Sequence, residues 1–117
     1  MGNFIIYHNP RCSKSRQTLA MLNEKGCEPE IFLYLKEELT VENLKKVLRK
    51  LNMEPRDILR KGEEEYRKNN LSDDRLNNED LINFMIKHPK LIERPIVVKE
   101  NKAILGRPPE NVLKLIG

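Results

Sequence analysis

The sequence is poor in cysteine and has no long apolar run. Its 117 residues include only two cysteines, Cys12 and Cys27, and a chain of this length can bury a core without disulfide bonds. The first apolar run covers only residues 4–7, far short of the roughly 20 residues that a membrane span needs. We therefore expect a soluble, cytoplasmic protein with no membrane partner.

Aromatic residues are also scarce, and charge of one sign is not segregated along the chain. Three Phe, three Tyr and no Trp are too few for the basic and aromatic platform that binds single-stranded nucleic acid. The net charge of +4 is compatible with an anionic partner, but Lys and Arg alternate with Asp and Glu along most of the sequence. We expect a solvated charged surface and no direct binding of nucleic acid.

The first third of the chain has the pattern of a strand, a helix and a second strand. Residues 4–7 form an apolar, β-favouring run that turn-forming residues follow. Residues 13–25 carry apolar side chains on a background of helix formers, and Gly26 is a suitable helix stop. Residues 31–35 are again strand-like, so we predict a βαβ unit with a parallel strand pair.

The middle of the chain is predicted to be helical. Thr40 can cap a first helix, Pro55 can open a second, and a third should follow the polar residues 69–78 and end at His88. The patterns before and after this segment differ from it, because both contain strand-like runs. We therefore interpret the middle as a helical insertion.

The last third predicts a β-hairpin and a short helix. Residues 96–98 and 103–105 are apolar and flank a polar turn, and two prolines at 108 and 109 can open the final helix. A parallel pair followed by a hairpin gives an α/β fold with a mixed four-stranded sheet flanked by helices. This is the arrangement of a thioredoxin-like fold with helices inserted in the middle, and we expect a single domain over residues 1–117.

Cys12 is the strongest candidate for a catalytic residue. It lies where the first predicted strand passes into the first helix, so its sulfur can face the free N–H groups and the positive end of the helix dipole. Arg11, Lys14 and Arg16 add positive charge nearby, and such surroundings lower the pKa of a thiol and bind anions. The alternative, a buried structural cysteine, is less favoured.

The sequence offers no internal thiol that could resolve a disulfide at Cys12. Ser15 stands where a C-x-x-C pair would have its second cysteine. Cys27 lies beyond the far end of a helix about 20 Å long, whereas a disulfide needs Cα atoms within about 7 Å. We expect an external thiol to react with Cys12 and assign Cys27 a structural or incidental place.

His8 is a second candidate near Cys12. It can lower the thiol pKa or move a proton, or it can be an ordinary hydrogen-bonded turn residue, and both interpretations stay open. A zinc site from His8, Cys12, Cys27 and His88 is disfavoured because the spacings match no usual ligand pattern, so no metal is expected. A phosphatase loop is excluded because Thr18 occupies the position that its arginine requires.

Residues 7–16, Tyr-His-Asn-Pro-Arg-Cys-Ser-Lys-Ser-Arg, resemble the active-site loop of the arsenate reductase family that works with glutathione and glutaredoxin. Three further stretches resemble motifs of that family in the same order: residues 59–61, 92–98 and 106–109. The resemblance therefore covers most of the chain. It implies a thioredoxin-like fold and the activity of an arsenate reductase.

The resemblance also implies roles for individual residues. Cys12 would attack the oxyanion, and Arg60, Arg94 and Arg107 would bind it through forked, charge-assisted hydrogen bonds. Pro95 resembles the proline that faces the nucleophile and usually follows a cis bond. His8, Ser15 and Arg16 would support the thiol.

The implied reaction uses arsenate or a similar oxyanion, with glutathione as co-substrate and glutaredoxin as the final reductant. Thiolate attack displaces water or hydroxide from arsenate, glutathione attacks the adduct, and arsenite leaves. Cys12 then remains in a mixed disulfide with glutathione, which glutaredoxin reduces. No cofactor need be bound, since the electrons arrive through thiols.

Two other functions stay open. A non-enzymatic regulator similar to the Spx proteins would bind RNA polymerase, although Ser15 removes the C-x-x-C switch that such proteins commonly carry. A thiol transferase acting on another substrate would need Cys12 but no group of three arginines.

Overall fold

The computed structural model describes residues 4–116 and divides into two compact units. One unit contains the residues up to Glu38 together with those from Arg94 onward, and the other contains Leu39–Glu93. The expectation of a single domain over residues 1–117 stays a prediction. No helix within residues 4–116 is long and apolar enough to cross a membrane.

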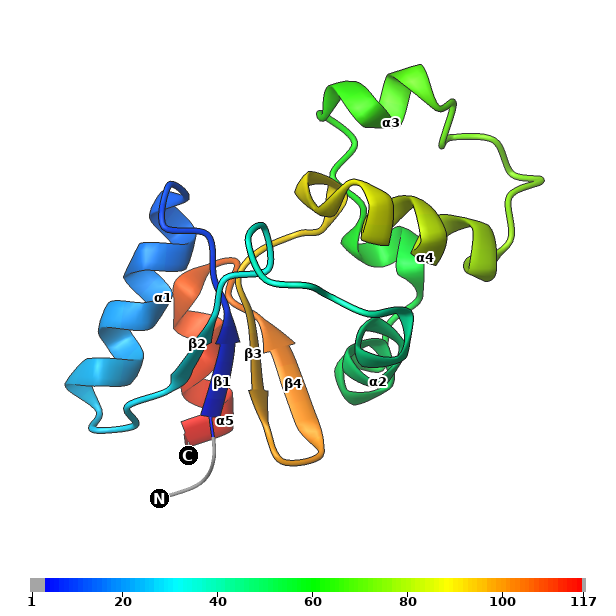
Figure 1. The fold of residues 1–117 in the computed structure, drawn as a ribbon. Helices are drawn as coiled ribbons and strands as arrows, with labels where there is room; N and C mark the ends of the chain where they lie inside the picture. Colours follow the sequence, from blue (N-terminus) through cyan, green and yellow to red (C-terminus); the bar gives the residue numbers. More distant parts are fainter. Residues whose placement is uncertain (1–3, 117) are drawn as a thin grey trace. The chain divides into compact units, whose positions relative to one another are not determined.

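The first unit is built on a four-stranded mixed sheet, as predicted (Figure 1). The strand order is β2-β1-β3-β4, in which β1 is parallel to β2 and antiparallel to β3, and β3 is antiparallel to β4. The strands are β1 (Phe4–Tyr7), β2 (Glu30–Phe32), β3 (Ile96–Lys99) and β4 (Lys102–Leu105). The parallel pair and the hairpin are thus joined through β1 and β3.

One face of this sheet is covered by the first and last helical segments of the chain. These are α1 (Ser13–Glu24), the 3-10 helix η3 (Pro109–Val112) and α5 (Leu113–Ile116), shown in blue and in orange to red in Figure 1. Leu22 of α1 and Val112 of η3 pack with apolar residues of β1 and β3, and all of them are nearly inaccessible to solvent. The packing fixes α1 against the sheet, and with it the start of the helix where Cys12 lies.

The second unit is helical, as predicted for the middle of the chain. Its elements are α2 (Val41–Leu51), η1 (Pro55–Ile58), α3 (Glu64–Lys68), α4 (Asn78–Lys87) and η2 (Pro89–Leu91). The oxygen of Thr40 accepts a hydrogen bond of 3.1 Å from the backbone N–H of Asn43, so the predicted N-cap of α2 is confirmed. An isolated antiparallel bridge between Leu59 and Ile92 ties η1 to the end of this unit.

Two sequence predictions about elements are wrong in extent. The second strand ends at Phe32 rather than at residue 35, because the N–H groups of Lys36 and Glu37 both bond to the carbonyl of Leu33 in a turn. The segment that Pro55 opens is a single 3-10 turn rather than an α-helix, since Leu59 leaves the helical path to pair with Ile92.

Candidate active site around Cys12

Cys12 is the N-cap residue of α1, as the sequence predicted. Its backbone is extended, with φ −93° and ψ 121°, and its carbonyl accepts the first helical hydrogen bond from Arg16 at 3.0 Å. The thiol is only partly buried, so a reagent from solution can reach it. The position places the sulfur at the positive end of the helix dipole.

The loop before Cys12 is held by hydrogen bonds from its own residues. The buried Asn9 accepts bonds of 3.0 Å from the N–H of Cys12 through its carbonyl and from the N–H of Arg11 through Oδ1. Arg16 donates from Nη1 to the carbonyl of Pro10 at 2.9 Å. These bonds fix the turn, so the thiol does not depend on a cap bond of its own for its position.

The surroundings of Cys12 lower the pKa of its thiol. Burial alone raises the pKa, but the backbone N–H of Ser15, the guanidinium of Arg94 and the backbone N–H of Lys14 outweigh it. Each of these groups favours the thiolate because it presents positive charge or a donor to sulfur. The side chain of Cys12 makes no N-cap hydrogen bond. The N–H groups of Ser15 and Lys14 therefore favour the thiolate through the positive charge that they present to the sulfur. A larger fraction of the Cys12 thiol is therefore ionised near neutral pH than in an ordinary cysteine.

His8, four residues before Cys12 in the chain, contacts Ser15 in the first turn of α1. The two side chains are buried, and Nδ1 of His8 lies 2.6 Å from Oγ of Ser15, which also accepts a bond of 3.1 Å from the N–H of Asn9. Burial and the nearby positive charge of Arg16 lower the pKa of His8. A neutral His8 thus anchors the first turn of α1, whose N–H groups act on the thiol. A catalytic role for His8 stays a prediction.

Arg94 and Arg107 come together with Cys12 in the first unit. Nη1 of Arg107 lies 3.9 Å from Sγ of Cys12 and donates a hydrogen bond of 3.1 Å to the carbonyl of Arg94. Arg94 lowers the pKa of Cys12, and its buried Nε has no hydrogen-bond partner among the residues that the structure describes. Two guanidinium groups beside a thiolate can bind a tetrahedral oxyanion through charge-assisted bonds.

The backbone next to the two arginines is closely packed. Pro95 follows a cis peptide bond after Arg94, and its carbonyl accepts a bond of 2.9 Å from the N–H of Gly106. Thr18, which is fully buried in α1, donates to the carbonyl of Lys14 at 2.8 Å and lies 3.4 Å from the carbonyl of Gly106. Sequence reasoning considered Thr18 only to exclude a phosphatase loop and missed its place beside Gly106.

Asn111 completes the support of Arg107. Its Nδ2 donates to the carbonyls of Leu105 at 3.3 Å and of Arg107 at 3.1 Å. Gly106, the residue just after β4, therefore lies beside Thr18 of α1, while Asn111 of η3 bonds to the carbonyls of the residues before and after it. The sequence carried no signal for this contact, since an Asn in the first turn of a helix is most often solvated.

Arg60 lies in the second unit, where two carboxylates engage it. Its Nη1 bonds to Oε1 of Glu93 at 2.7 Å and its Nε to Oε2 of Glu63 at 3.3 Å. Burial lowers the pKa of Arg60, but Glu93 and Glu63 together raise it. Sequence reasoning did not predict this pairing, although Glu63 stands three residues after Arg60 and Glu93 lies within one of the quoted motifs. The convergence of Arg60 with the other two arginines stays a prediction.

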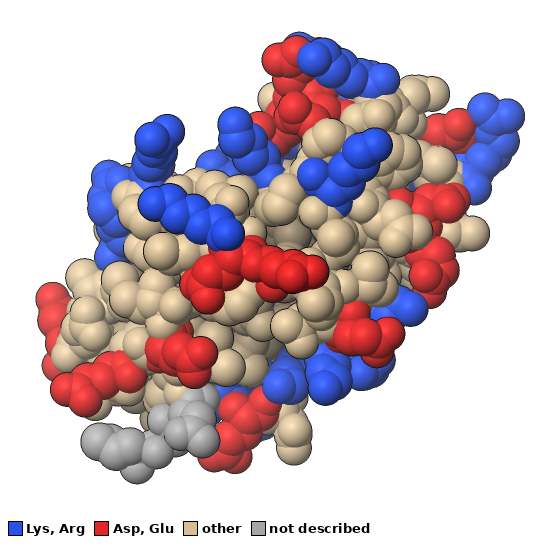
Figure 2. Space-filling model, in the orientation of Figure 1, with Lys and Arg blue, Asp and Glu red and all other residues tan. Residues whose placement is uncertain are grey.

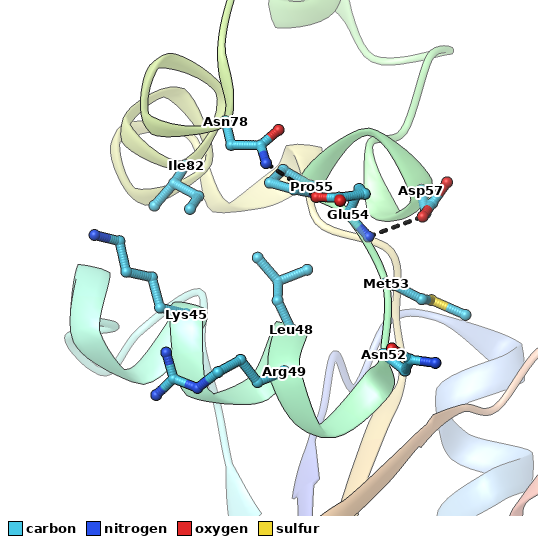
Figure 3. A pocket seen from close by; sticks show the side chains of 10 residues that line it. All are labelled: Lys45, Leu48, Arg49, Asn52, Met53, Glu54, Pro55, Asp57, Asn78 and Ile82. Atoms are coloured by element: carbon cyan, nitrogen blue, oxygen red, sulfur yellow. Dashed lines mark hydrogen bonds between the residues drawn. The ribbon is translucent and has the colours of Figure 1, made fainter.

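A separate groove of about 610 Å³ lies within the helical unit (Figure 3). Leu48 and Ile82 lie on its apolar part, while Lys45, Arg49 and Glu54 are among its charged residues. None of the residues predicted for the site lines it. Within residues 4–116, no group of three or more His, Cys, Asp or Glu side chains is placed to hold a metal ion.

The fold and the site together define a class of protein: a thioredoxin-like protein with a partly exposed cysteine of lowered pKa at the start of its first helix. A model of the ArsC family matches residues 7–115, and the chain belongs to this family.

Relatives of known sequence and structure resemble the chain over almost its whole length. An arsenate reductase of Haemophilus influenzae is 45% identical, with 96% of this chain and 97% of the relative covered. YfgD, an uncharacterized protein of Escherichia coli K12, is 50% identical over 96% of this chain and 95% of its own. The structure of an arsenate reductase from Vibrio cholerae is 47% identical and superposes with a TM-score of 0.94, covering 97% of both chains.

Proposed function

We propose that the protein is an arsenate reductase that uses glutathione and glutaredoxin. The observation that carries the proposal is the thiol of Cys12, which has a lowered pKa and lies beside Arg94 and Arg107. The H. influenzae and V. cholerae relatives, both arsenate reductases, support the choice of arsenate as the oxyanion. We place the reaction in the cytoplasm, where glutathione keeps thiols reduced.

The first step is the attack of Cys12 on arsenate. The thiolate forms a sulfur–arsenic bond, and an oxygen of arsenate leaves as water after it takes up protons. Arg94 and Arg107 bind the remaining oxygens and stay charged throughout the reaction. The thiolate is available near neutral pH because the pKa of Cys12 is lowered.

The second step is the reduction of arsenic by glutathione. The glutathione thiolate attacks the sulfur of the adduct, a disulfide bond forms, and the sulfur–arsenic bond breaks with its electron pair left on arsenic. Arsenic is thereby reduced from As(V) to As(III) and leaves as arsenite, while the two sulfurs are oxidised to the disulfide. A glutaredoxin thiol then takes glutathione from Cys12 and restores the thiol, so no bound cofactor is required.

Arsenate-dependent oxidation of NADPH tests the proposal in a mixture of the protein, glutathione, glutaredoxin and glutathione reductase. We expect turnover that Cys12→Ser abolishes. Arg94→Ala and Arg107→Ala should each lower kcat/KM for arsenate roughly ten- to hundredfold. This factor corresponds to a loss of about 1.5–3 kcal/mol of transition-state stabilisation, the contribution of a hydrogen bond to a charged group. Activity in Cys12→Ser, or unchanged kinetics in both arginine variants, would contradict the proposal.

The pairing of Arg60 with two carboxylates favours a second candidate, a thiol transferase that acts on glutathionylated proteins. That reaction needs the thiolate of Cys12 but no third arginine. Arg60→Ala separates the two functions, because it should weaken arsenate reduction and leave deglutathionylation of a model peptide unchanged. Loss of the peptide reaction in this variant would reject the second candidate.

A further inference from the structure

Two cations beside Cys12 are exposed and have no acidic partner. Arg11 lies directly before Cys12 and Lys14 two residues after it, and both side chains face solvent. The first turn of α1 contains no acidic residue, and within residues 4–116 no salt bridge engages either cation. Figure 2 shows Lys and Arg side chains gathered over the N-terminal end of α1, at the upper left.

The other cations near Cys12 are engaged within the site. Arg16 donates to the carbonyl of Pro10, Arg107 donates to the carbonyl of Arg94, and Arg94 acts on the thiol. The side chains of Arg11 and Lys14 make no hydrogen bond to any residue in the described part of the chain. Their charge is therefore available to a molecule that approaches from solution.

A thiol that reacts with Cys12 has to come from solution. Cys27 lies beyond the other end of α1, about 18 Å away along a helix of 12 residues, and packs against the core of the sheet. Both cysteines are free. Arg11, Ser13 and Lys14, the exposed residues next to Cys12 in the chain, put the two cations without an acidic partner close to the partly exposed thiol.

We propose that Arg11 and Lys14 form a docking face for a small thiol of net negative charge, of the glutathione class. Glutathione carries two carboxylates and one ammonium group near neutral pH, so its net charge is opposite to that of the face. The face concentrates the anionic thiol near Cys12 and raises the rate at which it meets the sulfur. The identity of the natural thiol rests on the proposed function, but the charge preference of the face does not.

The preference can be measured by thiol–disulfide exchange without arsenate. In a Cys27→Ser background, Cys12 is converted to its mixed disulfide with neutral pyridine-2-thiol. Attack of an added thiolate on the Cys12 sulfur forms a new disulfide and releases pyridine-2-thione, whose absorbance gives the rate. The rates with glutathione and with neutral 2-mercaptoethanol are compared in Arg11→Gln, Lys14→Gln and the double variant.

We expect the double variant to react about three- to tenfold more slowly with glutathione, whose thiolate form carries two net negative charges, and to slow less with 2-mercaptoethanol, whose thiolate form carries one. The difference should fade as added salt shortens the Debye length. Lys25→Gln is the matched control, because it removes one exposed cation at the opposite end of α1 and should change neither rate. The two single variants keep the test valid if the double variant does not fold.

Two results would overturn the docking face: equal changes with both thiols, or no change with glutathione. The test also separates this proposal from the proposed function. A charge-dependent exchange in a protein that fails to reduce arsenate would reject the reductase and support the face. Arsenate turnover with charge-independent exchange would reject the face alone.

Discussion

The reactivity of Cys12 depends on a balance between burial, which raises its pKa, and the positive groups around it, which lower it. Arg94 is the only side chain among those groups, so its removal is the clearest test. We expect Arg94→Gln to raise the pKa of Cys12 and to slow alkylation near neutral pH, because a smaller fraction of the thiol is ionised. The pH dependence of the rate with iodoacetamide gives the pKa, and Lys25→Gln serves as a control. An unchanged midpoint in Arg94→Gln would show that the backbone N–H groups alone set the pKa.

The lowered pKa of His8 predicts that the stability of the folded protein depends on pH. Its pKa is lowered from the usual value of 6.5 in the folded state by burial and by Arg16, so the unfolded chain binds the proton more tightly. The stability that neutral His8 contributes is therefore complete above the unfolded pKa and is lost as pH falls below it. Urea unfolding between about pH 8 and pH 5.5 should show this loss, with a slope of up to about 1.4 kcal/mol per pH unit. His8→Gln should flatten the curve in that window. Equal slopes in both proteins would contradict a lowered pKa.

At the residue scale, sequence reasoning placed the thiol correctly but missed contacts between side chains and residues far apart in the chain. The position of Cys12 followed from a strand that passes into a helix, which is local information. The contacts of Thr18 with Gly106 and of Arg60 with Glu93 join residues far apart in sequence, at 3.4 and 2.7 Å. A single sequence cannot pair such residues, because many side chains could satisfy the same charge or hydrogen bond.

At the scale of elements, the predictions succeeded where an apolar pattern was present. The helix α4 buries Leu81, Ile82 and Met85 on one face, and its period is visible in the sequence. The helix α3 was not predicted, since none of its five residues is buried and no hydrophobic period marks it. The early end of β2 depends on the carboxylate of Glu37, which accepts a bond of 2.8 Å from the N–H of Leu33. Such a side-chain bond leaves no periodic signal.

Thr18 of α1 lies so close to Gly106, the residue after β4, that one added methyl group at Gly106 should lower the stability of the protein. A Cβ at Gly106 would lie 2.6 Å from Oγ1 of Thr18 and 2.8 Å from Cγ of Pro95. We expect Gly106→Ala to lower the free energy of unfolding by about 1–3 kcal/mol, since this packing cannot accommodate the group without shifts. Urea unfolding measures the change, and Gly62→Ala is the matched control, because a Cβ there meets nothing within 4 Å.

A double-mutant cycle with Thr18→Ala tests the cause of this effect. Thr18→Ala removes Oγ1 and Cγ2, which would lie 2.6 and 3.1 Å from the new Cβ, and leaves only the contact with Pro95, so Gly106→Ala should cost less in the Thr18→Ala background. Strict additivity of the two changes would show that the clash with Pro95 alone sets the cost. A Gly106→Ala protein as stable as the wild type would contradict the packing seen in the structure.

At the scale of the whole molecule, the order of segments links the stability of the two units. The sheet unit is made of two separate segments, and the chain that joins them is the helical unit, Leu39–Glu93. If the helical unit unfolds, the sheet unit must close a long flexible loop, at an entropic cost of about 4 kcal/mol. This cost is a large share of the free energy of unfolding of a typical domain, which is about 5–15 kcal/mol. The helical insertion read from the sequence already implies this linkage.

The linkage predicts that a cavity in the helical unit lowers the stability of the sheet unit. Met85 is fully buried in α4, and Met85→Ala should lower the free energy of unfolding by about 2–5 kcal/mol. In a Cys12→Ser background, labelling of Cys27 in urea reports on the sheet unit, because Cys27 packs against its core. We expect the labelling midpoint to fall together with the loss of helical circular dichroism. Asn83→Ala, on the exposed side of the same helix, should leave both midpoints in place. A lower helical midpoint with unchanged Cys27 labelling would mean that the sheet unit folds without help from the chain that joins its two segments.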